Sequence, residues 1–263
     1  MTGDAADCTA FLAGLAESVG ADLLSRSGDR DLDTTRKSDR SWVTEADLLA
    51  DRLIADAIMA AYPQDTIVSE ELSPRHRPGS GNVWIVDPID GTSNFAVGLP
   101  LWGIAIARVV DGLLESAVVR FPALDETFLA RRGCGATLNG EPIRVRGPVD
   151  GKPAGFFVCC SRAPRGYRIN VPMKTRMLGA CSYTLCSVAR GVGALAFEST
   201  PKVWDLAAPM LIVEEAGGVT LPLAGPAVLP LDPEIDYRTR SFPYIAAATP
   251  VLARSAFEQI EPL

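Results

Sequence analysis

The chain has 263 residues and a formal net charge of −7, and its 48% hydrophobic and 22% charged residues are typical of a globular protein. No apolar run approaches the length of a membrane-spanning helix, and the acidic start lacks the basic region of a signal peptide, so we expect a cytoplasmic protein with no membrane partner. The negative charge argues against a nucleic-acid partner, but it does not exclude an anionic substrate, because bound cations invert the local field.

The cysteines and the histidine limit the kinds of metal site and catalytic arrangement that the chain can form. The six cysteines show no C-x-x-C spacing, so neither a zinc site nor a disulfide scaffold is indicated, and most should be buried thiols. His76 is the only histidine and lies in a loop-like segment, which argues against Ser-His-Asp and Cys-His catalysis. Acid–base work is therefore left to carboxylates, hydroxyls and metal-bound water.

The first quarter of the chain predicts two helices joined by an arm. Apolar residues at helical spacing predict an amphipathic helix over 7–24, and the polar segment 25–47 predicts a surface arm or hairpin. A second helix should run from Thr44 to about residue 62, with Thr44 as N-cap, Asp47 at the capping-box position and Val43 packed on Leu48. A short strand over 65–68 should follow, with Glu70 just past its end and an exposed loop over 73–81.

The stretch from residue 82 to 106 carries the chemistry. An apolar strand over 83–86 should end at Asp87, and Pro88 should turn the chain so that Asp90 returns beside Asp87. Two carboxylates this close either share a proton or bind a hard cation, Mg²⁺ before Zn²⁺. Gly91 permits close backbone approach, and the Thr92 and Ser93 hydroxyls can cap a helical turn whose amides face an anion. The alternative is an ordinary Asp-rich turn.

The rest of the chain predicts mixed strands and helices. Strands over 101–110, 113–120 and 127–131 should form an antiparallel meander with turns at 111–112 and 123–125, extended by a hairpin turn at 139–140. A strand over 156–160 is followed by a basic loop or short helix over 161–175, which is either solvated or lies over an anionic substrate. Because the segment 177–190 is helical in pattern, the G-x-G-x-x-A run at 191–196 is a poor dinucleotide motif.

Two acidic residues follow in the second half. A strand over 194–197 should deliver Glu198, and Asp205 should act as N-cap of a helix that ends near 215–216 at Gly217 and Gly218. Strands, loops and a last helix from Thr249-Pro250 complete the chain.

Two strings, WIVDPIDGTSNF at 84–95 and WDLAAPMLIVEEAGG at 204–218, resemble the signatures of the inositol monophosphatase family of Mg²⁺-dependent, lithium-sensitive phosphatases. The resemblance runs from about Lys37 to Gly218. It implies an α/β fold, the αβαβα five-layer sandwich of the inositol monophosphatase and fructose-bisphosphatase type, and a homodimer. Its two halves would be 1–147, with Glu70 and the DPIDGT motif, and 148–263, with Glu198 and Asp205, without a flexible linker.

The same resemblance implies roles for individual residues. Two to three Mg²⁺ ions would be held by Glu70, Asp87, the Ile89 carbonyl, Asp90 and Asp205. Catalysis would fall to Glu70 and Thr92, with Asp47 orienting Thr92, and substrate contacts to Asp90, Gly91, Thr92, Cys181 and Glu198. Lys37 corresponds to a lysine near the metal site. The chain departs from the family pattern at Ser41, where an acidic residue is usual, and over 179–183, where Gly-Ser-Ala-Ala is usual.

The activity implied is hydrolysis of a small phosphate monoester by metal-activated water, with inositol monophosphate or a similar polyol or sugar phosphate first. Histidinol phosphate, fructose 1,6-bisphosphate and 3′-phosphoadenosine 5′-phosphate are the alternatives within the family. A catalytically silent regulatory relative is the alternative outside catalysis, but it would be expected to lack a ligand, and none is missing.

Overall fold

The computed structural model describes residues 2–29, 34–36, 42–71, 82–232 and 234–263. Lys37, Ser41, His76 and the predicted loop over 73–81 lie outside the described residues, as does the side chain of Val43. Among the described helices, none is long and apolar enough to cross a membrane.

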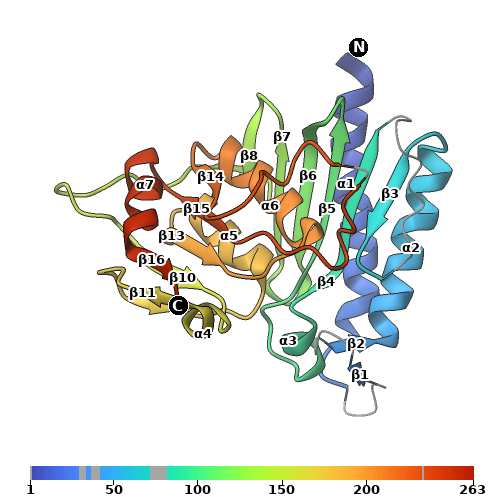
Figure 1. The fold of residues 1–263 in the computed structure, drawn as a ribbon. Helices are drawn as coiled ribbons and strands as arrows, with labels where there is room; N and C mark the ends of the chain where they lie inside the picture. The colour runs from blue at the N-terminus through green and yellow to red at the C-terminus, as the bar shows by residue number, and fades with distance from the viewer. Residues whose placement is uncertain (1, 30–33, 37–41, 72–81, 233) are drawn as a thin grey trace.

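The larger of the two main sheets has seven strands among the described residues, in the order β3-β4-β5-β6-β7-β8-β9 (Figure 1). β3 (Thr66–Ser69) runs parallel to β4 (Val83–Asp90). The antiparallel meander that follows comprises β5 (Gly103–Val110), β6 (Leu113–Phe121), β7 (Glu126–Arg131), β8 (Gly135–Leu138) and β9 (Glu141–Ile143), with the 3₁₀ turn η1 (Pro122–Leu124) after β6. The predicted turns at 111–112 and 139–140 are confirmed, and both of their residues have the positive φ of a tight hairpin.

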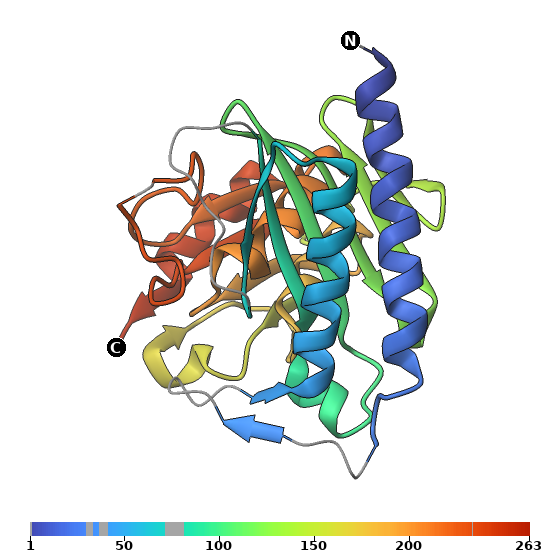
Figure 2. The ribbon, with the colours of Figure 1, turned by 90° about the vertical axis from the view of Figure 1, so that its right-hand side faces the viewer.

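Helices α1 (Thr2–Leu24) and α2 (Glu45–Ala61) cover one face of this sheet and lie side by side (Figure 2). The hairpin of β1 (Thr34–Arg36) and β2 (Trp42–Thr44) connects them, as predicted. α1 begins five residues before the predicted start. The two helices stay in place because their apolar sides bury a cluster with Trp84, Ile104 and Val118 of the sheet.

Two helices cover the opposite face, α5 (Cys181–Ala189) and α6 (Val203–Glu215). Alternation along the strands decides which side chains meet them, since Ala105 and Ala107 face α6 while Ile104 and Ile106 face α1 and α2. α5 begins at Cys181, so the predicted helix over 177–190 was too long at its start. α6 ends as predicted, because the amides of Gly217 and Gly218 bond back to the carbonyls of Glu214 and Val213.

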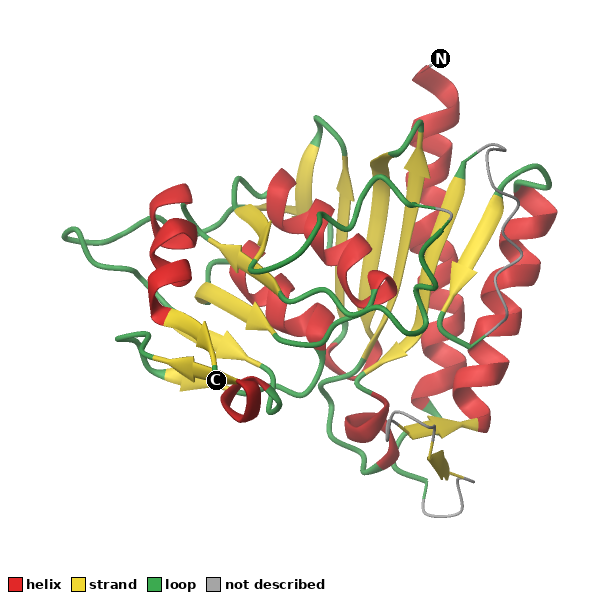
Figure 3. Ribbon diagram, viewed as in Figure 1, coloured by secondary structure: helices red, strands yellow, loops and turns green. Residues whose placement is uncertain are grey.

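The second main sheet lies beyond α5 and α6, so those helices are sandwiched between sheets (Figure 3). Its described strands are β12 (Thr175–Arg176), β10 (Phe156–Cys159), β13 (Gly193–Glu198), β15 (Tyr244–Ala247) and β14 (Val219–Pro222), in that order. α7 (Pro250–Gln259), capped by Thr249, packs on its outer face. Helices, sheet, helices, sheet and helix make the predicted five layers.

The segment 161–175 differs from the prediction of a loop or short helix. α4 (Ala163–Gly166) is the short helix, but β11 (Tyr167–Ile169) then pairs antiparallel with β16 (Ile260–Pro262), and Thr175 starts a strand beside β10. The partner of β11 comes from the far end of the chain, so no local pattern could indicate it.

Candidate functional site

Three carboxylates of the site come from two neighbouring parallel strands. Glu70 follows β3, whose last residue, Ser69, is paired with Val86 of β4. Asp87 and Asp90 both lie within β4, so the prediction that the strand ends at Asp87 was wrong: pairing with β5 resumes at Asp90 after an irregularity. Pro88 lies in this irregularity, where it has no N–H to give to the ladder. The interruption lets both aspartates face the same side.

Asp205 reaches this cluster from α6. The prediction that it is the N-cap was wrong, because Lys202 is the N-cap and Asp205 is the third helical residue. Its Oδ2 accepts a hydrogen bond of 2.5 Å from the Lys202 amide, which fixes the side chain at the helix start. Asp87, Asp90 and Asp205 each place a carboxylate oxygen within 4.8 Å of the other two.

The electrostatics of the cluster favour a bound cation. Burial, together with the charges of Glu70, Asp90 and Asp205, raises the pKa of Asp87 well above its ordinary value, and burial with the neighbouring charges does the same to the pKa of Asp205. Oδ1 of Asp87 accepts the Ile89 amide at 3.1 Å, whereas its buried Oδ2 has no hydrogen-bond partner among the described residues. An orphaned buried oxygen among carboxylates fits a hard divalent cation such as Mg²⁺.

The Asp90 carboxylate accepts hydrogen bonds from the first two residues of α5. Its Oδ1 accepts the Cys181 amide at 3.0 Å, and its Oδ2 accepts both the amide of Ser182, at 2.6 Å, and the Ser182 hydroxyl. Burial raises the pKa of Asp90, and the hydrogen bonds from Ser182 and Cys181 oppose that rise by favouring the ionised form. Since Ala180, the N-cap of α5, offers no side-chain cap, Asp90 also takes the place of the missing cap.

Thr92 opens the short helix α3 (Thr92–Ala96), whose N-cap is Gly91 with a φ of 85°. The expectation that a hydroxyl caps this turn was wrong, since the N-cap is a glycine and no side chain of the described residues makes a capping hydrogen bond. The Thr92 hydroxyl instead lies 3.0 Å from the Ile89 carbonyl oxygen and 3.2 Å from Oδ1 of Asp47, which confirms the predicted contact with Asp47. Asp47 is buried at the start of α2, where its Oδ2 closes the predicted capping box with Thr44.

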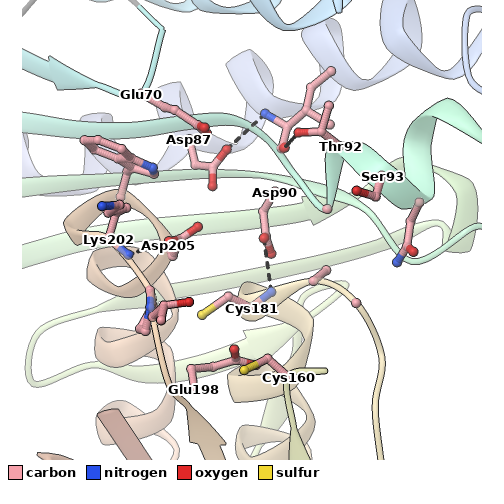
Figure 4. Close-up of a pocket in the computed structure, with 18 of the residues that line it drawn as sticks. Glu70, Asp87, Asp90, Thr92, Ser93, Cys160, Cys181, Glu198, Lys202 and Asp205 are labelled. Carbon is pink, nitrogen blue, oxygen red and sulfur yellow. Dashed lines mark hydrogen bonds between the residues drawn. The ribbon is translucent and has the colours of Figure 1, made fainter. Parts of the chain in front are cut away.

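The carboxylates of Glu70, Asp87, Asp90 and Asp205 border one cleft of about 800 Å³ (Figure 4). The predicted site residues that line it are Glu70, Asp87, Ile89, Asp90, Gly91, Thr92, Cys181, Glu198 and Asp205. Asp47 lies behind Thr92. The structure therefore brings together every predicted site residue that it describes.

Glu198, at the end of β13, borders the side of the cleft opposite Glu70 (Figure 4). Its side chain is buried, which raises its pKa to about 7 against the lowering effect of Thr184 and Cys160. Cys160 and Cys181 line the cleft beside it and Cys134 is exposed, so three of the six cysteines are not core thiols and the expectation that most would be buried was wrong.

Some residues of this cleft were not predicted. Cys160, Arg162, Lys202 and Arg238 line it, and Ser182 supports Asp90 from behind. Arg162 belongs to the basic segment 161–175, which was predicted either to be solvated or to lie over an anionic substrate. Lys202 was missed because the predicted helix began near Asp205, whereas α6 has Lys202 as its N-cap. The sequence signal for Ser182 is its place at the start of a helix whose preceding residue, Ala180, has no capping side chain, so that the first amides need an acceptor from elsewhere.

Comparison with known proteins gives one consistent match. The model of the inositol monophosphatase family matches residues 4–260. A histidinol-phosphatase of Chlorobaculum parvum is 37% identical over 216 residues, which cover 78% of this chain and 81% of that protein. A protein named Nus factor SuhB, from Pasteurella multocida, is 34% identical over 245 residues, covering 88% of this chain and 87% of the other. The solved structure of a Thermotoga maritima IMPase superimposes with a TM-score of 0.81 at 29% identity, covering 96% of each chain.

Proposed function

The chain belongs to the inositol monophosphatase family of phosphatases, and on this premise we propose that it hydrolyses a small phosphate monoester with Mg²⁺. The observation that carries the proposal is the cluster of Asp87, Asp90 and Asp205, whose oxygens lie within 4.8 Å of one another, with an orphaned buried oxygen on Asp87. Buried like charges without a cation would be costly, so a role for them is expected.

Two to three Mg²⁺ ions are proposed to bind here. Glu70, Asp87 and the Ile89 carbonyl would hold the first, and Asp87, Asp90 and Asp205 the second, with a weaker third near Glu70. Bound Mg²⁺ would neutralise phosphate oxygens, acidify a water molecule and stabilise the leaving alkoxide. All of the proposed ligands offer oxygen, which is the donor type that Mg²⁺ prefers.

Thr92, Glu70 and Asp47 are proposed to handle the attacking water. The Thr92 hydroxyl lies within 3.2 Å of both the Ile89 carbonyl oxygen and Oδ1 of Asp47. When the Thr92 hydroxyl donates its proton to one of these acceptors, its oxygen can accept a hydrogen bond from the attacking water. The Glu70 carboxylate would then accept a proton from that water as it attacks. The amides of Gly91 and Thr92 would bind the phosphate oxygens at the start of α3.

The other side of the cleft is proposed to bind the leaving group. Glu198, which lines the cleft with Cys181, would accept hydrogen bonds from hydroxyls, and this would favour monophosphates of polyols such as inositol over bisphosphates. Histidinol phosphate is the second candidate, since a relative at 37% identity is named histidinol-phosphatase and an acidic wall also suits a substrate amine.

A substrate panel with Mg²⁺ tests the proposal: inositol monophosphate, histidinol phosphate, fructose 1,6-bisphosphate and 3′-phosphoadenosine 5′-phosphate. Phosphate release that chelation of the metal abolishes is the expected result, with the highest kcat/KM for a monophosphate. A bisphosphate preferred by tenfold or more would contradict the role given to Glu198. No release from any member, with Mg²⁺ present, would favour the silent regulatory alternative, for which the resemblance to Nus factor SuhB is the supporting observation.

A further inference from the structure

The Ser182 hydroxyl donates a hydrogen bond to Asp90, a proposed metal ligand, and the proposed function gives this contact no role. Ser182 is fully buried at the second position of α5, and it donates two hydrogen bonds to a single oxygen of Asp90, one from its amide and one from its hydroxyl. Among the described residues, the hydrogen bond that the other oxygen, Oδ1, accepts comes from the Cys181 amide, at 3.0 Å. Any cation held by Asp90 must share this carboxylate with α5.

The hydrogen bonds divide the two oxygens of Asp90 unequally. A carboxylate offers about two lone-pair directions on each oxygen. Ser182 occupies both directions on Oδ2, whereas Cys181 occupies one on Oδ1 and leaves the other without a hydrogen bond from the part of the chain that the structure describes. Without the Ser182 hydroxyl, each oxygen would keep one free direction, and both could bind the same cation.

The backbone of this segment cannot easily shift to change that division. Gly179 has a φ of 83°, and a Cβ there would lie 2.8 Å from the side-chain nitrogen of Asn94. That nitrogen donates to the carbonyls of Leu101 and Leu178, at 2.6 and 3.0 Å. A Cβ on Gly91 would in turn lie 3.0 Å from Cβ of Ala180. The start of α5 is therefore packed tightly against the DPIDGT segment, and Ser182 is held in place against Asp90.

We propose that Ser182 is a positioning residue that restricts Asp90 to binding a cation through Oδ1 alone, and that it thereby favours Mg²⁺ over Ca²⁺. The inference rests on the proposed Mg²⁺ site. Mg²⁺ takes six ligands in a nearly octahedral arrangement and is served by single carboxylate oxygens, whereas Ca²⁺ takes six to eight and often binds both oxygens of one carboxylate. Because hydrogen bonds occupy Oδ2, Asp90 offers Ca²⁺ one ligand oxygen instead of two, whereas Mg²⁺ still receives the single oxygen that it uses.

Binding of Mg²⁺ and of Ca²⁺, measured by titration calorimetry on the substrate-free full chain, tests this inference. In Ser182→Ala we expect the ratio of the Ca²⁺ and Mg²⁺ dissociation constants to fall about tenfold, within the range found when a residue behind a metal ligand is changed. Ser182→Gly lacks the same hydroxyl and should shift the ratio in the same direction. Inhibition by Ca²⁺ of the Mg²⁺-supported phosphatase activity should strengthen in both variants.

Ser187→Ala is the matched control. Ser187 is also buried on α5, and its hydroxyl donates to the Thr184 carbonyl at 2.7 Å, away from Asp90. This variant should keep the wild-type ratio, and thermal unfolding in EDTA should show that all three variants are folded. A ratio within twofold of wild type in Ser182→Ala, or an equal shift in Ser187→Ala, would overturn the inference while leaving the metal site intact. If wild type binds neither cation, the proposed site itself fails, and the role of Ser182 fails with it.

Discussion

Replacing Asp87 by asparagine should change stability and activity in opposite directions. Asp87 is fully buried, and its charge is repelled by Glu70, Asp90 and Asp205. Asparagine has nearly the same shape, can still accept the Ile89 amide through its oxygen and can donate to a neighbouring carboxylate. The metal-free variant should therefore be more stable than the metal-free wild type, although it should be almost inactive.

The magnitude follows from the spacing of the carboxylates. Two unit charges 4.8 Å apart repel by about 3.5 kcal/mol at an effective dielectric constant of about 20. Uptake of protons by the cluster relieves part of this repulsion, so we expect a gain of about 2 kcal/mol in the free energy of unfolding. For a chain of this size, that corresponds to a rise of about 4–8 °C in Tm.

The gain should depend on pH with a definite sign. The pKa of Asp87 is higher in the folded state than its ordinary value of 3.8. Ionisation of this carboxyl in the wild type therefore lowers the free energy of unfolding as the pH rises above 3.8. The advantage of Asp87→Asn should therefore be largest at alkaline pH and shrink as the pH falls, since both side chains are then neutral.

Differential scanning fluorimetry in EDTA at low ionic strength measures this effect, and a second scan with millimolar Mg²⁺ gives the response to metal. Wild type should gain Tm with Mg²⁺ and the variant should gain much less, while its kcat falls by about a thousandfold. The reasoning would be refuted if Asp87→Asn lowered the Tm in EDTA. It would also be refuted if more than a tenth of kcat remained with an unchanged Mg²⁺ dependence.

Three further outcomes are expected. Lithium should inhibit the Mg²⁺-supported reaction, as the family resemblance implies, and an enzyme indifferent to lithium in a titration at fixed Mg²⁺ would depart from that expectation. Asp47→Ala should lower the free energy of unfolding, measured by denaturant titration, by about 1–2 kcal/mol because the Thr44 amide loses its acceptor, and it should lower kcat because Thr92 loses its contact with Asp47. A folded variant with unchanged kcat would show that Asp47 only caps the helix. The pKa of Glu198 is raised to about 7, so the KM for a polyol phosphate should fall as the pH rises from 6 to 8 and the carboxylate forms. This pH dependence of KM should be absent in Glu198→Gln, and its persistence there would assign it to another group.

Short-range signals in the sequence were enough for the local elements. The capping box of Thr44 and Asp47 and the tight turn at Asn139-Gly140 were predicted correctly. Each depends on a few neighbouring residues, whose φ preferences and hydrogen-bonding groups act over less than one turn of chain. The resemblance carried by the two signature strings also implied the five layers, which the structure confirms.

Other local predictions failed where distant partners intervene. β4 continues through Asp90 because β5 pairs with it on both sides of Pro88, and β11 is a strand because β16 lies beside it. A strand is defined by its partner, and a partner brought by the chain terminus leaves no trace in the local pattern.

The properties of the site itself belong to the tertiary structure. Ser182 meets Asp90 across 92 positions of sequence, because α5 is packed between the two sheets and its start abuts the DPIDGT segment. Burial is the main cause that raises the pKa of Glu198 to about 7, with the charge of Asp90 adding to it, and neither cause exists for the same carboxyl in water. The sequence by itself determined which carboxylates are present and that Glu70 follows a strand while Asp205 lies in the first turn of a helix. Only the packing of the layers decided how close they lie, how deeply they are buried and which of their oxygens stay open to a ligand, because repulsion and desolvation depend on distances that sequence spacing does not set.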